Sequence, residues 1–372
     1  MLQKSPEWFD WPHVNAHLPG LAAALSQHSL DELESPGNPG IELFRQHGGC
    51  AMVVPKDLGG LGLGPVEACN LHYEIGGLSP SLAVATTMHN FSVATIVEVA
   101  AQGDGIENLL LDAIANQKMY VASGFSEGKS QQHILRPAMK ATRVKGGITI
   151  RGVKKPCSLT HSMDLLTASV SLEDDGNETA AVALVSAKSD KIERRPFWAQ
   201  PALAGAESDE VILNDVFVED NLVLPLGGGN GERIQTRGLW WFELMITASY
   251  LGTAARLVRE VIAGGRGSPL SQIELVSDID TARAALLFMA QTLETEAEPS
   301  LERLLSIRLA IQQCIQRVAP KAMALLGGMR FITSAETAYF AVASQALSFH
   351  PPNDEALAQR ILGGLHGEHF VV

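Results

Sequence analysis

The chain has 372 residues, of which 46% are hydrophobic and 19% are charged, a balance typical of a globular protein with two or three domains. The net charge of −13 argues against a nucleic-acid partner, since such proteins present a basic face to the phosphates. The four cysteines show no C-x-x-C spacing, so neither a metal site nor a disulfide framework is expected. The first twenty residues do not resemble a secretory signal, and no apolar run is predicted to span a bilayer. We therefore expect a cytoplasmic protein that does not enter a membrane.

The first part of the chain, residues 1–118, reads as helices joined by Gly- and Pro-rich turns. Apolar residues recur at helical spacing in "SPSLAVATTMHNFSVATIVEVAAQG" and in "GIENLLLDAIANQ". Ser79 followed by Pro80 predicts a helix start, because proline in the first turn loses no hydrogen bond that the helix would make. These residues are predicted to form an N-terminal helical domain.

The pattern changes at residue 119. Alternating runs such as "ITIRG", "DLLTASVSL" and "DEVILNDVFV" are separated by Gly, Asp and Asn, which predicts strands and turns. Residues 119–225 are therefore expected to form a middle β domain, a barrel or a sandwich. The segment "LPLGGGNGE", residues 224–232, has no helical or strand period and is predicted to be a linker.

Helical periodicity returns after this linker. "LWWFELMITASYLGTAARLVREVI" is apolar on almost all sides, which predicts a buried helix. "LERLLSIRLAIQQCIQRV" carries an apolar stripe. Residues 226–372 are predicted to form a C-terminal domain like a four-helix bundle. The fold class is thus α+β and multidomain, with helices on either side of a β domain.

Several segments, in order along the chain, resemble the acyl-CoA dehydrogenase family. "VVPKDLGGLGLGPVEACN" is similar to the family's Pro-x-x-x-Gly-Gly-x-Gly segment, "SGFSEGKS" stands at its Thr-Glu-Pro-Gly segment, and "LLGGMRF" matches its late Gly-Gly segment. The resemblance covers nearly the whole chain and implies this family's fold. It also implies bound FAD, subunits that contribute to each other's sites, and removal of an α-proton and a β-hydride from an acyl thioester.

The same resemblance implies four cofactor-binding residues. Ser126 and Ser158 fall on hydroxyl positions that contact flavin, although both could instead be turn serines at strand ends. Arg266, in "GGRGSPLSQ", could meet a phosphate or be a solvated loop charge. Gly328 would allow close approach of a backbone. FMN or an empty site stays open, because neighbouring family residues are replaced.

The catalytic base is the main departure from the family pattern. Pro351 occupies the usual glutamate position and cannot accept a proton. A shift of one residue would bring His350 there; the alternative interpretation is that His350 only ends a helix, where a partly charged imidazole suits the dipole. Some family members carry the base on the first long C-terminal helix, where Glu243 is the lone ionisable residue of an apolar stretch. We therefore expect Glu243 to be the catalytic carboxylate, to pair with Arg237 or Arg256, or to be exposed where two subunits meet.

Three functions follow as hypotheses. The first is a flavin-dependent oxidoreductase that dehydrogenates an acyl thioester of coenzyme A or a carrier protein. The second is a monooxygenase on the same fold, which uses reduced flavin and oxygen and has no need of a glutamate at position 351. The third is a flavin-free relative that only binds a partner. In each case a homodimer or homotetramer is expected.

Overall fold

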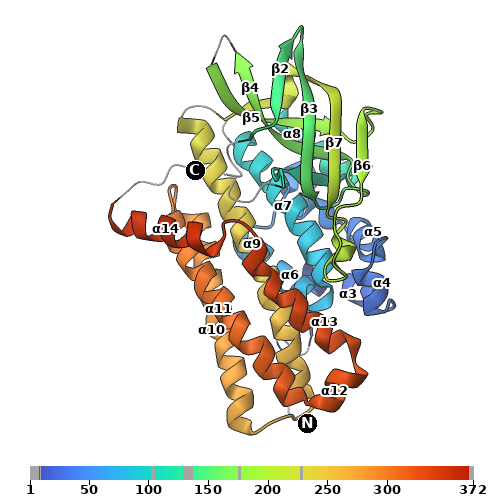
Figure 1. The fold of residues 1–372 in the computed structure, drawn as a ribbon, viewed down its shortest axis with the longest axis vertical. Helices are drawn as coiled ribbons and strands as arrows, with labels where there is room; N and C mark the ends of the chain where they lie inside the picture. The colour runs from blue at the N-terminus through green and yellow to red at the C-terminus, as the bar shows by residue number, and fades with distance from the viewer. Residues whose placement is uncertain are drawn as a thin grey trace. The chain divides into compact units, whose positions relative to one another are not determined.

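The computed structural model describes residues 8, 10–101, 105–128, 137–174, 177–226 and 229–367 (Figure 1). In the first 118 residues, the described elements are helical, as predicted. They are α2 (Pro12–His17), α3 (Leu21–Leu25), α4 (Leu30–Glu34), α5 (Pro39–Gln46), η1 (Gly49–Ala51), η2 (Lys56–Leu58), α6 (Pro65–Leu78), α7 (Pro80–Ala100) and α8 (Glu107–Gln117). The predicted start at Pro80 is confirmed.

A single mixed sheet follows. Its strands are β1 (Val121–Gly124), β2 (Lys140–Val144), β3 (Gly147–Cys157), β4 (Leu165–Asp174), β5 (Asn177–Ser186), β6 (Ile192–Arg195), β7 (Asp209–Glu219) and β8 (Val223–Pro225), with η3 (Ala204–Ala206) and η4 (Asp220–Leu222) between them. The order is β6-β7-β3-β2-β4-β5-β8, with β1 parallel to β4. In β7 the side chains that face the core are Val211, Leu213, Val216 and Val218, because alternate side chains of a strand point to the same side. The buried positions change from odd to even numbers after Leu213, where the register of the β3–β7 pair shifts by one residue.

The C-terminal part is again helical. It comprises α9 (Gly229–Ala263), α10 (Pro269–Thr295), α11 (Leu301–Leu326), α12 (Gly328–Thr333), α13 (Ala335–Ser344), η5 (Gln345–Phe349) and α14 (Asp354–Leu365). Residues 240–255 of α9 are buried throughout, so the predicted buried helix is confirmed. The linker prediction for 224–232 is wrong at both ends, because Leu224 and Pro225 belong to β8 and α9 already begins at Gly229; residues 227 and 228 lie outside the described part of the chain.

Two compact units can be distinguished. Among the described residues, one unit contains those up to 47, 63–87 and 242–367, and the other contains those within 48–62 and 88–241. The N-terminal helices are thus divided between the units, and the whole sheet belongs to the second. In the first unit α10 packs against α6 and against α11 (Figure 1). The boundaries 118/119 and 225/226 stay predictions for independently folding domains.

Helices α6 and α9 approach each other closely within the first unit. A Cβ atom on Gly76 would lie 2.0 Å from the carbonyl oxygen of Ser249, and one on Gly252 would lie 1.8 Å from that of Tyr73. No side chain fits at such distances, so both positions require glycine. This contact fixes the part of α9 that carries the candidate catalytic residues.

Helix α7 changes one expectation from the sequence. Over its 21 residues it is long and apolar enough to span a membrane, contrary to the prediction that no run would be. However, 61% of its most apolar window is buried inside the protein. That environment is the one of a core helix in a globular protein.

Candidate active site

Glu243 lies on α9 with its side chain fully buried. The Nε atom of Arg308, on α11, is 2.8 Å from Glu243 Oε2, and both side chains are at most 1% exposed. The N–H bonds are not directed at the carboxylate, whose two oxygens accept no hydrogen bond from the described residues. Burial raises the pKa of Glu243 to about 7, although Arg308 and Arg360 oppose this shift. A carboxylate that titrates near neutrality can both accept and release a proton.

The predicted ion-pair partners of Glu243 were wrong. Arg237 pairs with Glu98, and Arg256 pairs with Glu260. The partner is Arg308, which is 65 positions further along the chain than Glu243. A signal was nevertheless present, since Arg308 falls within the apolar stripe of its own helix, between the buried Leu304 and Ile311. An arginine on a buried face needs an anionic partner.

The Arg308 guanidinium also forms hydrogen bonds to the end of η5 and the turn that follows it. Its Nη2 donates to the carbonyl oxygens of Leu347 and His350, both at 3.0 Å. One turn further along α11, Gln312 donates to Asp354 at 2.9 Å. The "HPPND" segment is thus attached to α11 by buried side chains and ends η5, as the helix-stop interpretation predicts. The next helix is capped by Asn353, which accepts from the Ala356 amide.

This turn places His350 against α9, the helix that carries Glu243. Its Nε2 lies 2.8 Å from the Tyr250 hydroxyl, and its ring centroid is 6.2 Å from that of Phe242. Burial and the nearby Arg308 lower the pKa of His350 to about 3, so the imidazole is neutral at physiological pH. The expected partial charge at a helix end is therefore not favoured. A histidine with so low a pKa is also a weak proton acceptor.

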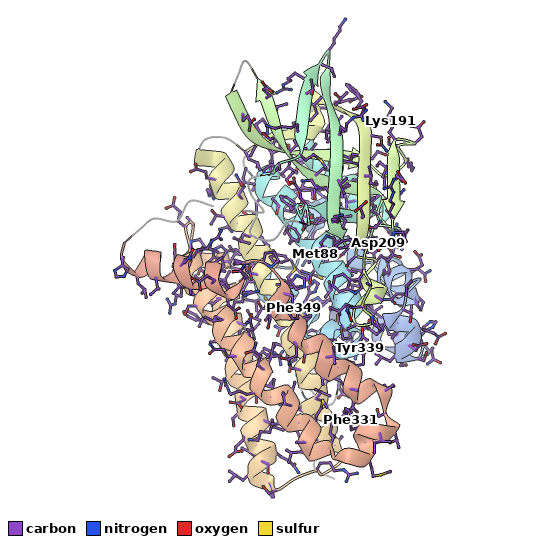
Figure 2. The ribbon with its side chains drawn as sticks, viewed as in Figure 1. Met88, Lys191, Asp209, Phe331, Tyr339 and Phe349 are labelled. Carbon is purple, nitrogen blue, oxygen red and sulfur yellow. The ribbon has the colours of Figure 1, made fainter. Side chains whose placement is uncertain are left out.

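A second buried carboxylate, Glu34, lies in the same unit. It accepts hydrogen bonds from Ser79 Oγ at 2.6 Å, from the Ser81 amide at 3.0 Å and from the Tyr339 hydroxyl on α13. Figure 2 marks Tyr339. Burial raises the pKa of Glu34 to about 7 in spite of these hydrogen bonds. Because both of its carboxylate oxygens accept hydrogen bonds from the protein, we interpret Glu34 as a structural residue.

Ser126 follows β1 and Ser158 follows β3, and the Ser126 backbone is hydrogen-bonded to β3. The Ser126 carbonyl accepts from the Lys155 amide at 2.9 Å, three residues before Ser158. The Ser126 hydroxyl has no hydrogen-bond partner among the described residues and is half-buried, whereas Ser158 Oγ is paired with Ser208 Oγ at 2.9 Å. Ser126 therefore has the hydroxyl available for a flavin heteroatom. Residues 129 and 130 of its segment lie outside the described residues.

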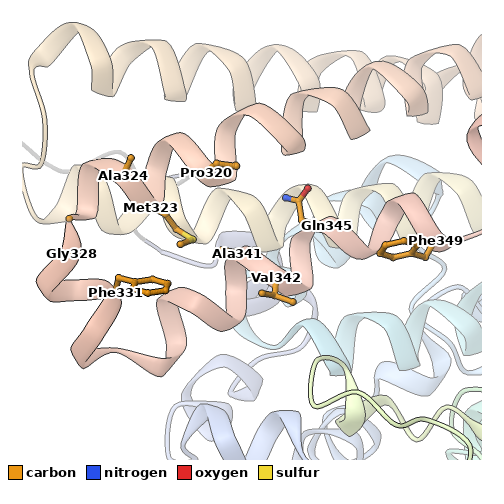
Figure 3. Close-up of a pocket in the computed structure, with 10 residues that line it drawn as sticks. Pro320, Met323, Ala324, Gly328, Phe331, Ala341, Val342, Gln345 and Phe349 are labelled. Atoms are coloured by element: carbon orange, nitrogen blue, oxygen red, sulfur yellow. The ribbon is translucent and has the colours of Figure 1, made fainter.

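Arg266 and Gly328 are both near the far end of α11. The Arg266 side chain is exposed, and the adjacent Gly267 lies against the Leu325 side chain. A Cβ on Gly328 would meet nothing within 4 Å, so the described chain makes no close approach there. Gly328 instead lines an apolar groove of about 680 Å³ between the end of α11 and helices α12 and α13 (Figure 3).

Among known proteins, no protein-family model matches the chain. The chain is 39% identical over 343 residues to isobutylamine N-hydroxylase from Streptomyces viridifaciens, which covers 90% of this chain and 91% of that protein. The chain belongs to the acyl-CoA dehydrogenase-fold flavoenzymes. The resemblance read from the glycine segments is thereby confirmed.

Solved structures agree on the fold of this flavoenzyme. KijD3 in complex with FMN and dTDP-3-amino-2,3,6-trideoxy-4-keto-3-methyl-D-glucose superposes with a TM-score of 0.81 at 16% identity, over 99% of this chain and 96% of that one. The prolyl acyl carrier protein oxidase AnaB gives a TM-score of 0.81 at 16% identity, over 95% and 98%. The expected α+β fold is confirmed, and the protein is an oxidoreductase of the flavoenzyme type.

Proposed function

We propose that this flavoenzyme is a monooxygenase that N-hydroxylates a small primary alkylamine. The observation that carries the proposal is the 39% identity, over nine tenths of both chains, to isobutylamine N-hydroxylase. Pro351 at the usual base position agrees with it, because oxygen transfer to nitrogen needs no carboxylate to remove a carbon-bound proton. The amino group of the sugar in the KijD3 complex points to the same class of substrate.

The chain's own part in this reaction is proton transfer and positioning. An alkylammonium ion must lose a proton before its nitrogen lone pair can form a bond to oxygen. We assign that proton to the Glu243 carboxylate, which has a pKa near 7 and two oxygens without a hydrogen bond. His350 and Tyr250 hold each other in a neutral pair and would orient the substrate rather than take the proton.

Flavin fits this reaction and the available hydroxyl of Ser126. When bound, reduced flavin supplies the two electrons that let dioxygen give one oxygen atom to the amine and the other to water. We propose that Ser126 donates to the flavin ring. FMN is favoured over FAD, because the Arg266 segment expected to meet an FAD pyrophosphate is short and exposed.

Substitution of Arg266 separates the two flavins. If FMN is the cofactor, Arg266→Ala should leave the Kd of FMN unchanged, as measured by quenching of flavin fluorescence. If FAD is the cofactor and Arg266 contacts its pyrophosphate, the same variant should bind FAD about tenfold more weakly, since a lost charged contact is worth roughly 1.5 to 3 kcal/mol.

The function is tested by incubating the protein with isobutylamine, FMN, ¹⁸O₂ and a separate NADH-dependent flavin reductase. The expected product is the alkylhydroxylamine with one ¹⁸O atom, detected by mass spectrometry. Glu243→Gln should lose product, while Glu34→Gln, which changes the second buried carboxylate, should keep it. Consumption of reduced flavin without a labelled hydroxylamine, over a panel of short amines, would reject the proposal.

A second candidate is α,β-dehydrogenation of an acyl thioester. The similarity in fold to a prolyl acyl carrier protein oxidase favours it, as does a lone carboxylate on α9. In that case acyl thioesters, and not amines, would bleach the oxidised flavin without oxygen. A carrier protein or coenzyme A would then be the partner.

We also propose that the chain forms the homodimer or homotetramer expected for its family. Several large apolar side chains near the groove are exposed, and contact with a second subunit would remove them from water; they are Met329, Phe331, Ile332, Val342 and Phe349. Figure 2 labels Phe331 and Phe349. Light scattering should give a mass that is a multiple of 39.8 kDa, and Phe331→Asp should lower it.

A further inference from the structure

The face of α9 that carries Glu243 holds a second unusual group. Thr247 follows one helical turn later, is fully buried, and its hydroxyl has no hydrogen-bond partner in the described part of the chain. Residues four apart share a face of a helix, and side chains tilt toward the helix N-terminus. The Thr247 side chain therefore leans toward the turn of Glu243.

Other hydroxyl residues of the same helix behave differently. Ser249 Oγ donates to the carbonyl oxygen of Met245 at 2.8 Å, and Thr253 Oγ1 donates to that of Ser249 at 2.9 Å. Such bonds to the preceding turn are the usual way in which a helix satisfies a buried hydroxyl. Thr247 makes no such bond, so its hydroxyl remains free to serve another group.

Leaving these atoms unpaired in the interior is costly. A buried polar group without a hydrogen bond costs about 1 to 3 kcal/mol, and native interiors contain few of them. Here Thr247 Oγ1 and both Glu243 oxygens are such atoms, and the two residues lie one turn apart on the same helix. A carboxylate only accepts hydrogen bonds, and Arg308 Nε already lies 2.8 Å from Oε2, so the ligand that completes this cluster must donate a hydrogen bond to Oε1.

The surroundings limit what that ligand can be. Arg308 already compensates the charge of Glu243, and Arg360 adds a further positive charge nearby. Two guanidinium groups disfavour a second cation that stays charged, and they favour a bound amine that has released its proton. The Phe242 ring, whose centroid is 6.2 Å from that of His350, offers apolar contact for a short alkyl group.

We propose that Thr247 Oγ1 and Glu243 Oε1 form the binding site for the amino group of a primary alkylamine, with Thr247 as its positioning residue. The identity of this ligand rests on the proposed function. The N–H bonds of the amine would be directed to the carboxylate and to the hydroxyl, and the alkyl chain would lie toward His350.

The test uses the flavin-loaded protein and measures the Kd of isobutylamine by titration calorimetry, with isobutanol as the probe that lacks the amino group. Thr247→Val should raise the Kd for the amine about three- to tenfold, the effect of one hydrogen bond, and leave isobutanol unaffected. It should not lower the melting temperature, because it removes an unpaired buried hydroxyl. Thr247→Ser should restore amine binding.

Thr253→Val is the matched control on the same helix. It removes a hydroxyl that bonds to the carbonyl oxygens of Gly76 and Ser249. It should therefore lower the melting temperature and leave the Kd of isobutylamine unchanged. This is the opposite of the pattern expected for Thr247→Val.

Two results would overturn the inference. In one, Thr247→Val binds isobutylamine as tightly as the unchanged protein does. In the other, it loses stability without a change in amine affinity, which would indicate that the hydroxyl serves a water molecule. Failure of the proposed function would look different, since the variants would then alter amine binding as expected but the unchanged protein would form no hydroxylamine.

Discussion

Arg308 and His350 are joined by a hydrogen bond of 3.0 Å from the guanidinium Nη2 to the histidine carbonyl oxygen. The same guanidinium lies 2.8 Å from Glu243. One side chain of α11 thus positions both catalytic candidates, one on α9 and one in the turn after η5. Neither candidate could keep its place if this arginine were removed.

Replacing Arg308 should therefore destabilise the fold strongly. Arg308→Met removes the ion-pair partner of the buried Glu243, which keeps only the charge of Arg360 nearby, and leaves two carbonyl groups without a donor; loss of one partner of a buried ion pair costs about 3 to 5 kcal/mol. The free energy of unfolding, measured in urea, should fall by that amount. The double variant Arg308→Met, Glu243→Leu should recover a large part of it. If the double variant is as unstable as the single one, the pair is not the source of the loss.

Substitution of His350 distinguishes its two interpretations. His350→Gln keeps an acceptor for the Tyr250 hydroxyl, so we expect kcat for hydroxylamine formation to change by no more than about threefold. Loss of a general base usually lowers the rate by about 10² to 10⁴. A loss in that range would show that His350, despite its low pKa, accepts a proton in the reaction.

Glu34 should make the folded state more sensitive to alkaline than to mildly acidic pH. Its pKa is about 7 in the folded protein, against 4.5 as the ordinary value, so between these values the folded chain binds a proton that the unfolded chain does not. The free energy of unfolding must therefore fall as pH rises through this window, by on the order of 2 kcal/mol for this group. Urea unfolding of Glu34→Gln should show a flatter profile between about pH 5 and about pH 7; Glu243 contributes in the same direction and keeps some slope. An unchanged profile would exclude Glu34 as a source.

Flavin affinity should depend on Ser126 more than on Ser158. Ser126→Ala removes a hydroxyl with no partner in the described structure, so its effect on folding should be small, while the Kd of FMN should rise about three- to tenfold. Ser158→Ala removes the hydrogen bond to Ser208, so it should lower the melting temperature and change the Kd of FMN less than Ser126→Ala does. Equal flavin affinity in Ser126→Ala and the unchanged protein would remove Ser126 from the flavin site.

The sequence by itself determined the class of fold and the family. Two local patterns carry this information: the alternation along β3, β4, β5 and β7, and the apolar period of α9 and α11. A strand or helix that buries one face must show its own period, whichever element it packs against. The first glycine segment carried the resemblance because close backbone contacts, such as that of Gly60 with the carbonyl oxygen of Val54, tolerate no side chain. The stop at "HPPND" followed from the prolines, which lack the N–H that a helix needs.

Only the tertiary structure decided which side chains meet. Glu243 and Arg308 are 65 positions apart, and the choice of Arg308 over the nearer Arg237 and Arg256 depends on which faces of α9 and α11 pack together. The sequence likewise does not distinguish the free hydroxyl of Thr247 from the bonded hydroxyl of Thr253. Both threonines lie on the same helix, and each has a carbonyl oxygen four residues earlier that could accept its hydrogen bond. Hydrogen bonding and the pKa of a buried group are set by neighbours in space, which no local pattern specifies.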